Sequence, residues 1–184
     1  MTWRTHLLVG INALWVLAPL PNALAADTVG LLALTASVGA LLPDFDATRS
    51  KVRSLDIGGA RPLVPLADAL NHAFGHRGLL HSPVGWVGFG LLCLLLDPWL
   101  SSAGRGWEPS LGLFIGYGSH LIADSATPSG IPSTGIYPWL VRRRRFHLLP
   151  KCLRVVTGSQ AEDALLLPLA AGATLLLLRA LFQA

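Results

Sequence analysis

Charged side chains are scarce in this chain of 184 residues, where Asp, Glu, Lys and Arg together make up 13%. Soluble domains carry about twice as many, roughly 25%, because charged side chains cover a surface that faces water. Apolar residues account for 52% of the chain, and the mean hydropathy is +0.55. These values exclude a disordered chain and argue against an ordinary soluble enzyme. They predict a small integral membrane protein.

Cysteine is also rare, because the chain contains only Cys93 and Cys152. Two cysteines cannot form a disulfide framework or a four-cysteine zinc site, so a metal site would need other side chains. The 19 Gly and 13 Pro residues follow no repeating pattern, which excludes a collagen-like or low-complexity chain. The length has room for one domain, and residues 1–184 are therefore predicted to form a single domain.

Five apolar stretches are candidates for membrane helices. The first, Leu7–Ala26, has no charge across 20 residues, which is the length that a spanning helix needs. The others are Thr28–Leu42, Pro83–Leu96 with an extension to Leu100, Leu111–Ala126 and Ala164–Leu178. The sequence thus predicts an all-α fold, a multi-pass membrane bundle of about five transmembrane helices. Alternatively, Leu7–Ala26 is a signal peptide, cleaved after Ala23-Leu24-Ala25.

Lys and Arg are distributed unevenly between the two sides of this topology. Twelve of the 14 lie in the N-terminal segment or in the 43–82 and 127–163 connections, which share one side of a five-span bundle. Because basic residues favour the cytoplasmic side, these connections are predicted to face the cytoplasm of a bacterial inner membrane. The same asymmetry explains the net charge of +4 without a nucleic-acid partner.

Polar residues are costly inside a membrane, so their positions carry information about function. On the five-span topology, the candidates all fall at the cytoplasmic ends of the predicted helices. They are His6, Asp44, Asp46, His76, Arg77, His81, His120, Asp124 and Glu162. Separate pieces of chain would thus bring imidazole and carboxylate groups to one face, which predicts a polar site there.

The spacing of His120 and Asp124 sharpens this prediction. Residues i and i+4 share one face of a helix, about 6 Å apart. An imidazole and a carboxylate at that spacing suit a divalent ion such as Zn²⁺ or Mn²⁺. Asp44 and Asp46 follow a proline and would lie on one side of an extended turn. Two carboxylates so close are unfavourable unless a cation lies between them or one stays protonated.

Several of these features have structural alternatives that the sequence leaves open. His81, followed by Ser82 and Pro83, could belong to an ordinary helix entrance. Asp44 and Asp46 could merely end one helix and begin a turn. Ser159 and Glu162 have the S-x-x-E spacing of a capping box, so Glu162 is either a helix cap or a metal ligand. His147 follows a run of arginines and is interpreted as a solvated loop residue.

The motifs as a set resemble one family over nearly the full chain. LLPDFD, FGHRGLLHS and GYGSHLIADSATPSGIP occur in that order and are followed by Pro138-Trp139 and the GSxxE around Glu162. The chain resembles the YdjM-like family of bacterial membrane-bound metal-dependent hydrolases, inner-membrane proteins under SOS-repressor control. That resemblance implies a multi-pass inner-membrane protein with a metal site. The implied ligand set is His6, Asp44, Asp46, His76, His81, His120 and Asp124.

The leading hypothesis is a membrane-bound metal-dependent hydrolase that cleaves a phosphoester of a lipid or lipid-linked substrate with metal-activated water. The expected ligands are His6, Asp44, His81, His120 and Asp124, with Glu162 as a further ligand or a partner of one. Asp46 is expected to be a bridging ligand or base, and His76 to be the general acid. Arg77 would hold the phosphate. A weaker likeness to zinc-dependent phospholipase C serves only as an analogy for the reaction type.

Two other functions remain possible from the sequence. His120 and Asp124 could form an intramembrane ion site in a metal-ion or proton transporter. A closed metal site could also serve as a non-catalytic scaffold. The hydrolase hypothesis expects membrane lipids and a small-molecule or lipid phosphoester as partners.

Overall fold

The computed structural model describes residues 1–19, 24, 26–47, 50, 53–56, 58–74, 78–100, 106–133 and 145–183. Six α-helices dominate these residues: α1 Trp3–Asn12, α2 Ala26–Leu41, α3 Val64–Phe74, α4 Pro83–Leu100, α5 Glu108–Ser125 and α6 Leu167–Gln183. Short 3₁₀ helices join several of them, namely η1 Ala13–Leu17, η2 Pro43–Asp46, η3 Leu79–His81 and η4 Lys151–Leu153. A π-helical turn, η5 Glu162–Leu166, leads into α6.

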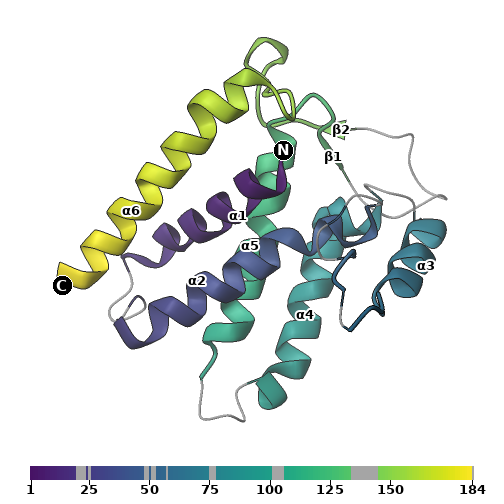
Figure 1. Ribbon diagram of the computed structural model, residues 1–184, viewed down its shortest axis with the longest axis horizontal. Coiled ribbons are helices and arrows are strands. Elements are labelled where there is room, and N and C mark those ends of the chain that lie inside the picture. Colours follow the sequence, from purple (N-terminus) through teal and green to yellow (C-terminus); the bar gives the residue numbers. More distant parts are fainter. Residues whose placement is uncertain are drawn as a thin grey trace.

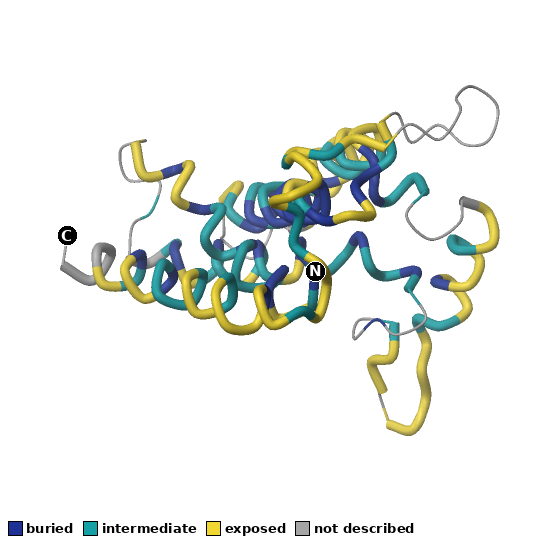
Figure 2. The backbone as a smooth tube through the Cα atoms, turned by 90° about the horizontal axis from the view of Figure 1, so that it is seen from above, coloured by how far each residue is buried: buried dark blue, intermediate teal, exposed yellow. Residues whose placement is uncertain are grey.

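Helix α5 is the central element of the arrangement (Figure 1). It packs most extensively against α2, and it also contacts α1 and α4. Helix α6 lies along α1 on the outer side, and the N-terminus lies beside the C-terminal end of α5 (Figure 1). Buried residues gather in the middle of the molecule, with exposed residues around them (Figure 2). The C-terminal half of α5 is therefore enclosed by other elements.

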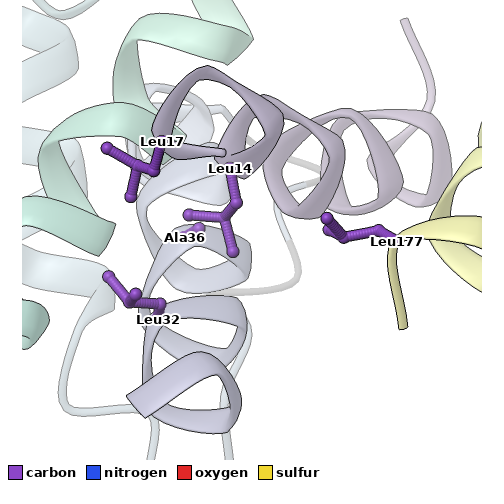
Figure 3. Packing of buried hydrophobic residues seen from close by; sticks show 5 residues of the cluster. All are labelled: Leu14, Leu17, Leu32, Ala36 and Leu177. Atoms are coloured by element: carbon purple, nitrogen blue, oxygen red, sulfur yellow. The ribbon is translucent and has the colours of Figure 1, made fainter. Parts of the chain in front are cut away.

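A small apolar cluster holds η1, α2 and α6 together. Leu14 and Leu17 of η1 pack with Leu32 and Ala36 of α2, and Leu177 of α6 joins them from the side (Figure 3). All five residues are buried. Burying a leucine side chain contributes roughly 1.5–3 kcal/mol, so this cluster fixes the end of the bundle away from the polar residues.

The chain after α5 folds back onto that helix. β1 (Ile131–Pro132) pairs antiparallel with β2 (Arg145–Phe146). The backbone N–H of Leu148 donates to Ser125 O, and that of Val155 donates to Ala126 O. These bonds satisfy carbonyl groups that the end of a helix leaves unpaired. The returning segment thus closes the C-terminal end of α5.

The described residues are mostly helical, as predicted, but the multi-pass transmembrane bundle is wrong. Among the residues that the structure describes, none of the helices combines the length and the apolar character needed to cross a bilayer. The longest, α4 and α5, have 18 residues each and extend about 27 Å, against a hydrocarbon core of roughly 30 Å. The assignment of the connections to one side of the membrane rested on that topology and loses its basis.

The first predicted span, Leu7–Ala26, shows why counting apolar residues was misleading. The α-helix ends at Asn12, and a 3₁₀ helix continues only to Leu17. The Asn12 amide Nδ2 donates to Leu8 O, and also to Ala170 O and Thr174 Oγ1 of α6. A polar side chain that links two helices takes the place of a continuous apolar surface at this point.

Candidate metal centre

The site begins with the close approach of α5 to α2. A Cβ atom added to Gly116 would lie 2.0 Å from Ala36 O, and one added to Gly39 would lie 2.2 Å from Leu113 O. Only residues without a side chain permit this separation of the two backbones. The close contact places the next turn of α5, which carries His120, directly beside the C-terminal turn of α2.

His120 is held there by a hydrogen bond to the backbone. Its Nδ1 donates to Ala40 O over 2.7 Å, and the ring is fully buried. Burial lowers the pKa of His120 well below its usual value, and the neighbouring His6 and His81 lower it further. In the neutral ring that results, the proton is on Nδ1 and the lone pair is on Nε2. The Nε2 atom is therefore prepared to bind a cation.

Asp44 and His81 approach His120 from two short 3₁₀ helices. His81 Nε2 lies 3.2 Å from Asp44 Oδ1 and 3.3 Å from His120 Nε2. Asp44 Oδ1 is also 3.9 Å from His120 Nε2. Pro43 begins the 3₁₀ turn directly after α2, which keeps Asp44 close to Ala40 and hence to His120.

His6 and Asp124 form the other side of the cluster. The His6 ring stacks on His120, with 3.8 Å between ring centroids and 15° between ring planes. His6 Nε2 lies 3.4 Å from Asp124 Oδ1, and Asp124 Oδ2 lies 3.8 Å from His120 Nε2. The amino nitrogen of Met1 is 3.0 Å from Asp124 Oδ1. Asp124 is thus already surrounded by groups that favour its negative charge.

Two overlapping sets of ligand atoms result, and His120 belongs to both. One set is His6, His120 and Asp124, and the other is Asp44, His81 and His120. Ligand atoms bound tetrahedrally at 2.0–2.1 Å from a zinc ion lie about 3.4 Å apart. The separations of 3.2 to 3.4 Å match that spacing, and those of 3.8 and 3.9 Å are slightly wider. The Nε2 atom of His6 faces this cluster, at 3.4 Å from Asp124 Oδ1.

The histidines set the charge of the two carboxylates. Burial by itself raises the pKa of Asp44 and of Asp124, because it disfavours the charged form. For Asp44, the hydrogen bond to His81 and the charges of the neighbouring histidines together outweigh burial; for Asp124, the hydrogen bond to His6 does so together with the charges of His120, His6 and the N-terminal amino group. Both pKa values therefore fall below the usual range. The carboxylates are ionised at neutral pH, as metal ligands must be.

The structure thus brings together five predicted ligands, whereas Asp46 and Glu162 belong to neither ligand set. Asp46 is buried but belongs to neither set, and its backbone carbonyl accepts from Asn71 Nδ2. Glu162 is buried too, but its carboxylate contacts Thr2, Thr5 and Gly158. His76 and Arg77 lie outside the described residues. His147, interpreted as a loop residue, contacts Pro128 O away from the cluster.

Sequence reasoning missed two contributors to the site. The carbonyl of Ala40 fixes the tautomer of His120, but a backbone atom leaves no mark in a residue pattern. Gly116 sets the distance between α5 and α2, and here a signal exists. Gly112 and Gly116 have the G-x-x-x-G spacing that allows two helices to approach closely.

Fold and site together define a helical protein with a buried histidine and aspartate cluster that could hold a metal ion. The model of the YdjM inner membrane protein family matches residues 1–183, and the chain belongs to that family. The predicted family and the predicted location in the bacterial inner membrane are therefore confirmed.

Individual relatives agree with this assignment. The uncharacterized protein YvsG of Bacillus subtilis (strain 168) is 35% identical over 170 residues, which cover 90% of this chain and 88% of YvsG. The inner membrane protein YdjM of Escherichia coli (strain K12) is 30% identical over 168 residues, or 88% of this chain and 76% of YdjM. No solved structure matches the chain.

Proposed function

We propose that this protein is a metal-dependent hydrolase that cleaves a phosphoester of a lipid or lipid-linked molecule. The observation that carries the proposal is the pair of ligand sets that share His120. Zn²⁺ or Mn²⁺ suits this mixture of imidazole and carboxylate ligands. When bound, such an ion would polarise the phosphoryl oxygen and lower the pKa of a water molecule.

The protein's own residues would supply the geometry of the reaction. His120 is fixed by Ala40 O, and the stacked His6 ring limits movement on one side. Asp44 is the ligand that reaches solvent, with 28% of its side chain exposed, so the substrate would approach from its side. His76 and Arg77 lie outside the described residues and keep their proposed roles as general acid and phosphate anchor.

The arrangement favours hydrolysis over the transport alternative. Five ligand side chains from α1, η2, η3 and α5 form two adjoining sets that share His120. Ion transport instead needs a succession of weaker sites along a path. A group of ligands with one partly exposed member is better suited to holding an ion in place while a substrate reaches it.

The proposal predicts metal-dependent phosphoesterase activity. Detergent-purified protein should contain Zn²⁺ or Mn²⁺, and it should hydrolyse at least one member of a panel of phosphomonoesters, phosphodiesters and lipid esters. A chelator should abolish the activity, and added metal should restore it. His147→Ala, which removes a histidine outside the cluster, is the matched control and should behave as wild type. Protein that binds neither ion, or hydrolysis that a chelator leaves unchanged, would refute the proposal.

An apolar groove between α4 and α5 supports a lipid substrate. It has a volume of about 420 Å³ and is lined by apolar residues that include Val87 and Leu91 of α4 and Phe114 of α5. From Val87 to Asp97 the groove extends about 15 Å by the helical rise, which is half of the roughly 30 Å hydrocarbon core. Phe114 precedes His120 by six residues, or about 9 Å along α5. We propose that one hydrocarbon chain of the substrate lies in this groove.

This proposal predicts that filling the groove raises the KM only for substrates with long hydrocarbon chains. Leu91→Trp should raise the KM for a long-chain lipid phosphoester about tenfold, because losing contact with two methylene groups costs about 1.6 kcal/mol. The KM for a short, water-soluble phosphoester should stay within twofold. Leu95→Trp is the control, since Leu95 is on the same helix and exposed but does not line the groove. Equal effects of Leu91→Trp on both substrates would contradict the assignment.

A further inference from the structure

Glu162 was predicted as a metal ligand or a helix cap, and its contacts point to a third role. Its carboxylate is fully buried. Oε1 accepts hydrogen bonds of 2.6 Å from the backbone N–H of Thr2 and from the hydroxyl of Thr5. Oε2 accepts one of 2.8 Å from the N–H of Gly158. With three donors, the carboxylate is already occupied and is not part of either ligand set.

The contacts of Glu162 extend beyond what a cap requires. The local capping bond exists, because the Glu162 N–H donates to Ser159 Oγ over 3.3 Å. The bonds to Thr2 and Thr5, by contrast, join residues 160 and 157 positions apart in the chain. Burial by itself raises the pKa of Glu162, but these hydrogen bonds outweigh it and keep the pKa below its usual value. The carboxylate is thus ionised, and charge-assisted bonds of this kind are about twice as strong as neutral ones.

The bonded residues directly precede His6. Helix α1 begins at Trp3 and lies between α5 and α6. Successive residues on a helix differ by about 100° in direction, so Thr5 can face Glu162 of η5 while His6 faces α5. A hydrogen bond that holds Thr5 on Glu162 therefore fixes the rotation of α1 about its axis. It fixes at the same time the height at which the His6 ring stacks on His120.

We infer that Glu162 and Thr5 form a clamp that positions His6 for metal binding from outside the ligand set. The inference rests on the proposed metal site, which it extends by two positioning residues. The clamp joins the first turn of α1 to η5, the turn that leads into α6, so the C-terminal part of the chain takes part in the site although it contributes no ligand. A partner that orients a metal ligand usually affects metal affinity 10–100-fold.

Thr5→Val tests the clamp, because it removes the hydroxyl but preserves the shape of the side chain. We expect the Kd for Zn²⁺, measured by competition with a chromophoric chelator, to rise about 10- to 100-fold. Thr5→Ser restores the hydroxyl and should bring the Kd back to within about threefold of wild type. Glu162→Gln removes the charge from the same bond and should also weaken Zn²⁺ binding.

Thr174→Val is the matched control for a merely structural effect. Thr174 of α6 is also a buried threonine that faces α1, and its hydroxyl accepts from Asn12 Nδ2 of α1 over 2.9 Å. This variant should lower the thermal stability but leave the Kd for Zn²⁺ within about twofold. An equal loss of Zn²⁺ affinity in Thr174→Val and Thr5→Val would show that α1 docking in general, and not the clamp, controls the site.

A double-mutant cycle shows whether the clamp acts through His6. In a His6→Ala background, Thr5→Val should have no further effect on the Kd, because the ligand that it positions is gone. If Thr5→Val alone leaves the Kd unchanged, or weakens binding equally with and without His6, the clamp is refuted while the metal site stands. Wild-type protein that does not bind Zn²⁺ or Mn²⁺ would refute both the proposed function and the clamp.

Discussion

His120→Ala is expected to abolish metal binding and hydrolysis while leaving a folded protein. His120 is the ligand common to both sets, so its removal leaves at most two members in each. The ring is also buried against Ala40 O and His6, where no other imidazole can replace it. We expect the affinity for Zn²⁺ to fall by more than about a hundredfold, beyond the range for residues that only orient a ligand.

Metal content after purification and the Zn²⁺-dependent shift in Tm measure this effect. Wild-type protein should gain thermal stability with Zn²⁺, because a ligand that binds only the folded state stabilises it. His120→Ala should show no shift. Asp124→Asn should show the same loss, since the amide has no charge to bind the ion, and His147→Ala should retain the shift. Full metal content in Asp124→Asn would mean that this carboxylate is structural.

Gly116→Ala should lower the stability of the protein and displace His120, which lies four residues further along α5. The added Cβ would lie 2.0 Å from Ala36 O, so α5 must move away from α2. Overpacking of this kind costs about 1–3 kcal/mol in the free energy of unfolding, and each kcal/mol lowers the Tm by about 2–4 °C at this size. Because the movement separates His120 from Ala40 O, Zn²⁺ affinity should fall as well.

Gly30→Ala on α2 serves as the control for this substitution. No atom lies within 4 Å of a Cβ built there, so the change should be neutral or stabilise the helix by up to about 1 kcal/mol. Zn²⁺ affinity should not change. If Gly116→Ala also keeps the wild-type Tm and Zn²⁺ affinity, the close contact between α2 and α5 does not determine the geometry of the site.

Much of the helical layout can be predicted from apolar runs and their boundaries. The stretch Thr28–Leu42 corresponds to α2 at Ala26–Leu41, and Pro83 begins α4 as expected. The error was to treat every apolar run as a membrane crossing. In the first run, Asn12 marks the end of α1, and its contacts lie on α6, more than 150 residues later in the chain. Hydropathy averages over such a residue and gives no sign of its distant partners.

The candidate site was predictable to the extent that it depends on local spacing. His120 and Asp124 are one helical turn apart, and Asp44 follows a helix end, so their chemistry is visible in the sequence. Glu162 shows the limit of this reasoning. Its spacing from Ser159 matches a capping box, but its strongest bonds reach Thr2 and Thr5. Which residues lie across from a side chain depends on the packing of α1 against α6, which no local pattern records.

The uneven exposure of the cluster bears on how quickly an ion could exchange. Asp44 has 28% of its side chain exposed, whereas the side chains of His6, His81, His120 and Asp124 are 0–1% exposed. An ion leaving the cluster must therefore pass Asp44 or wait for the helices to separate locally. Release should then be slow and first-order, at a rate independent of the chelator concentration. Preparing metal-free protein would take long incubation with a small chelator, and loading would be fastest during folding.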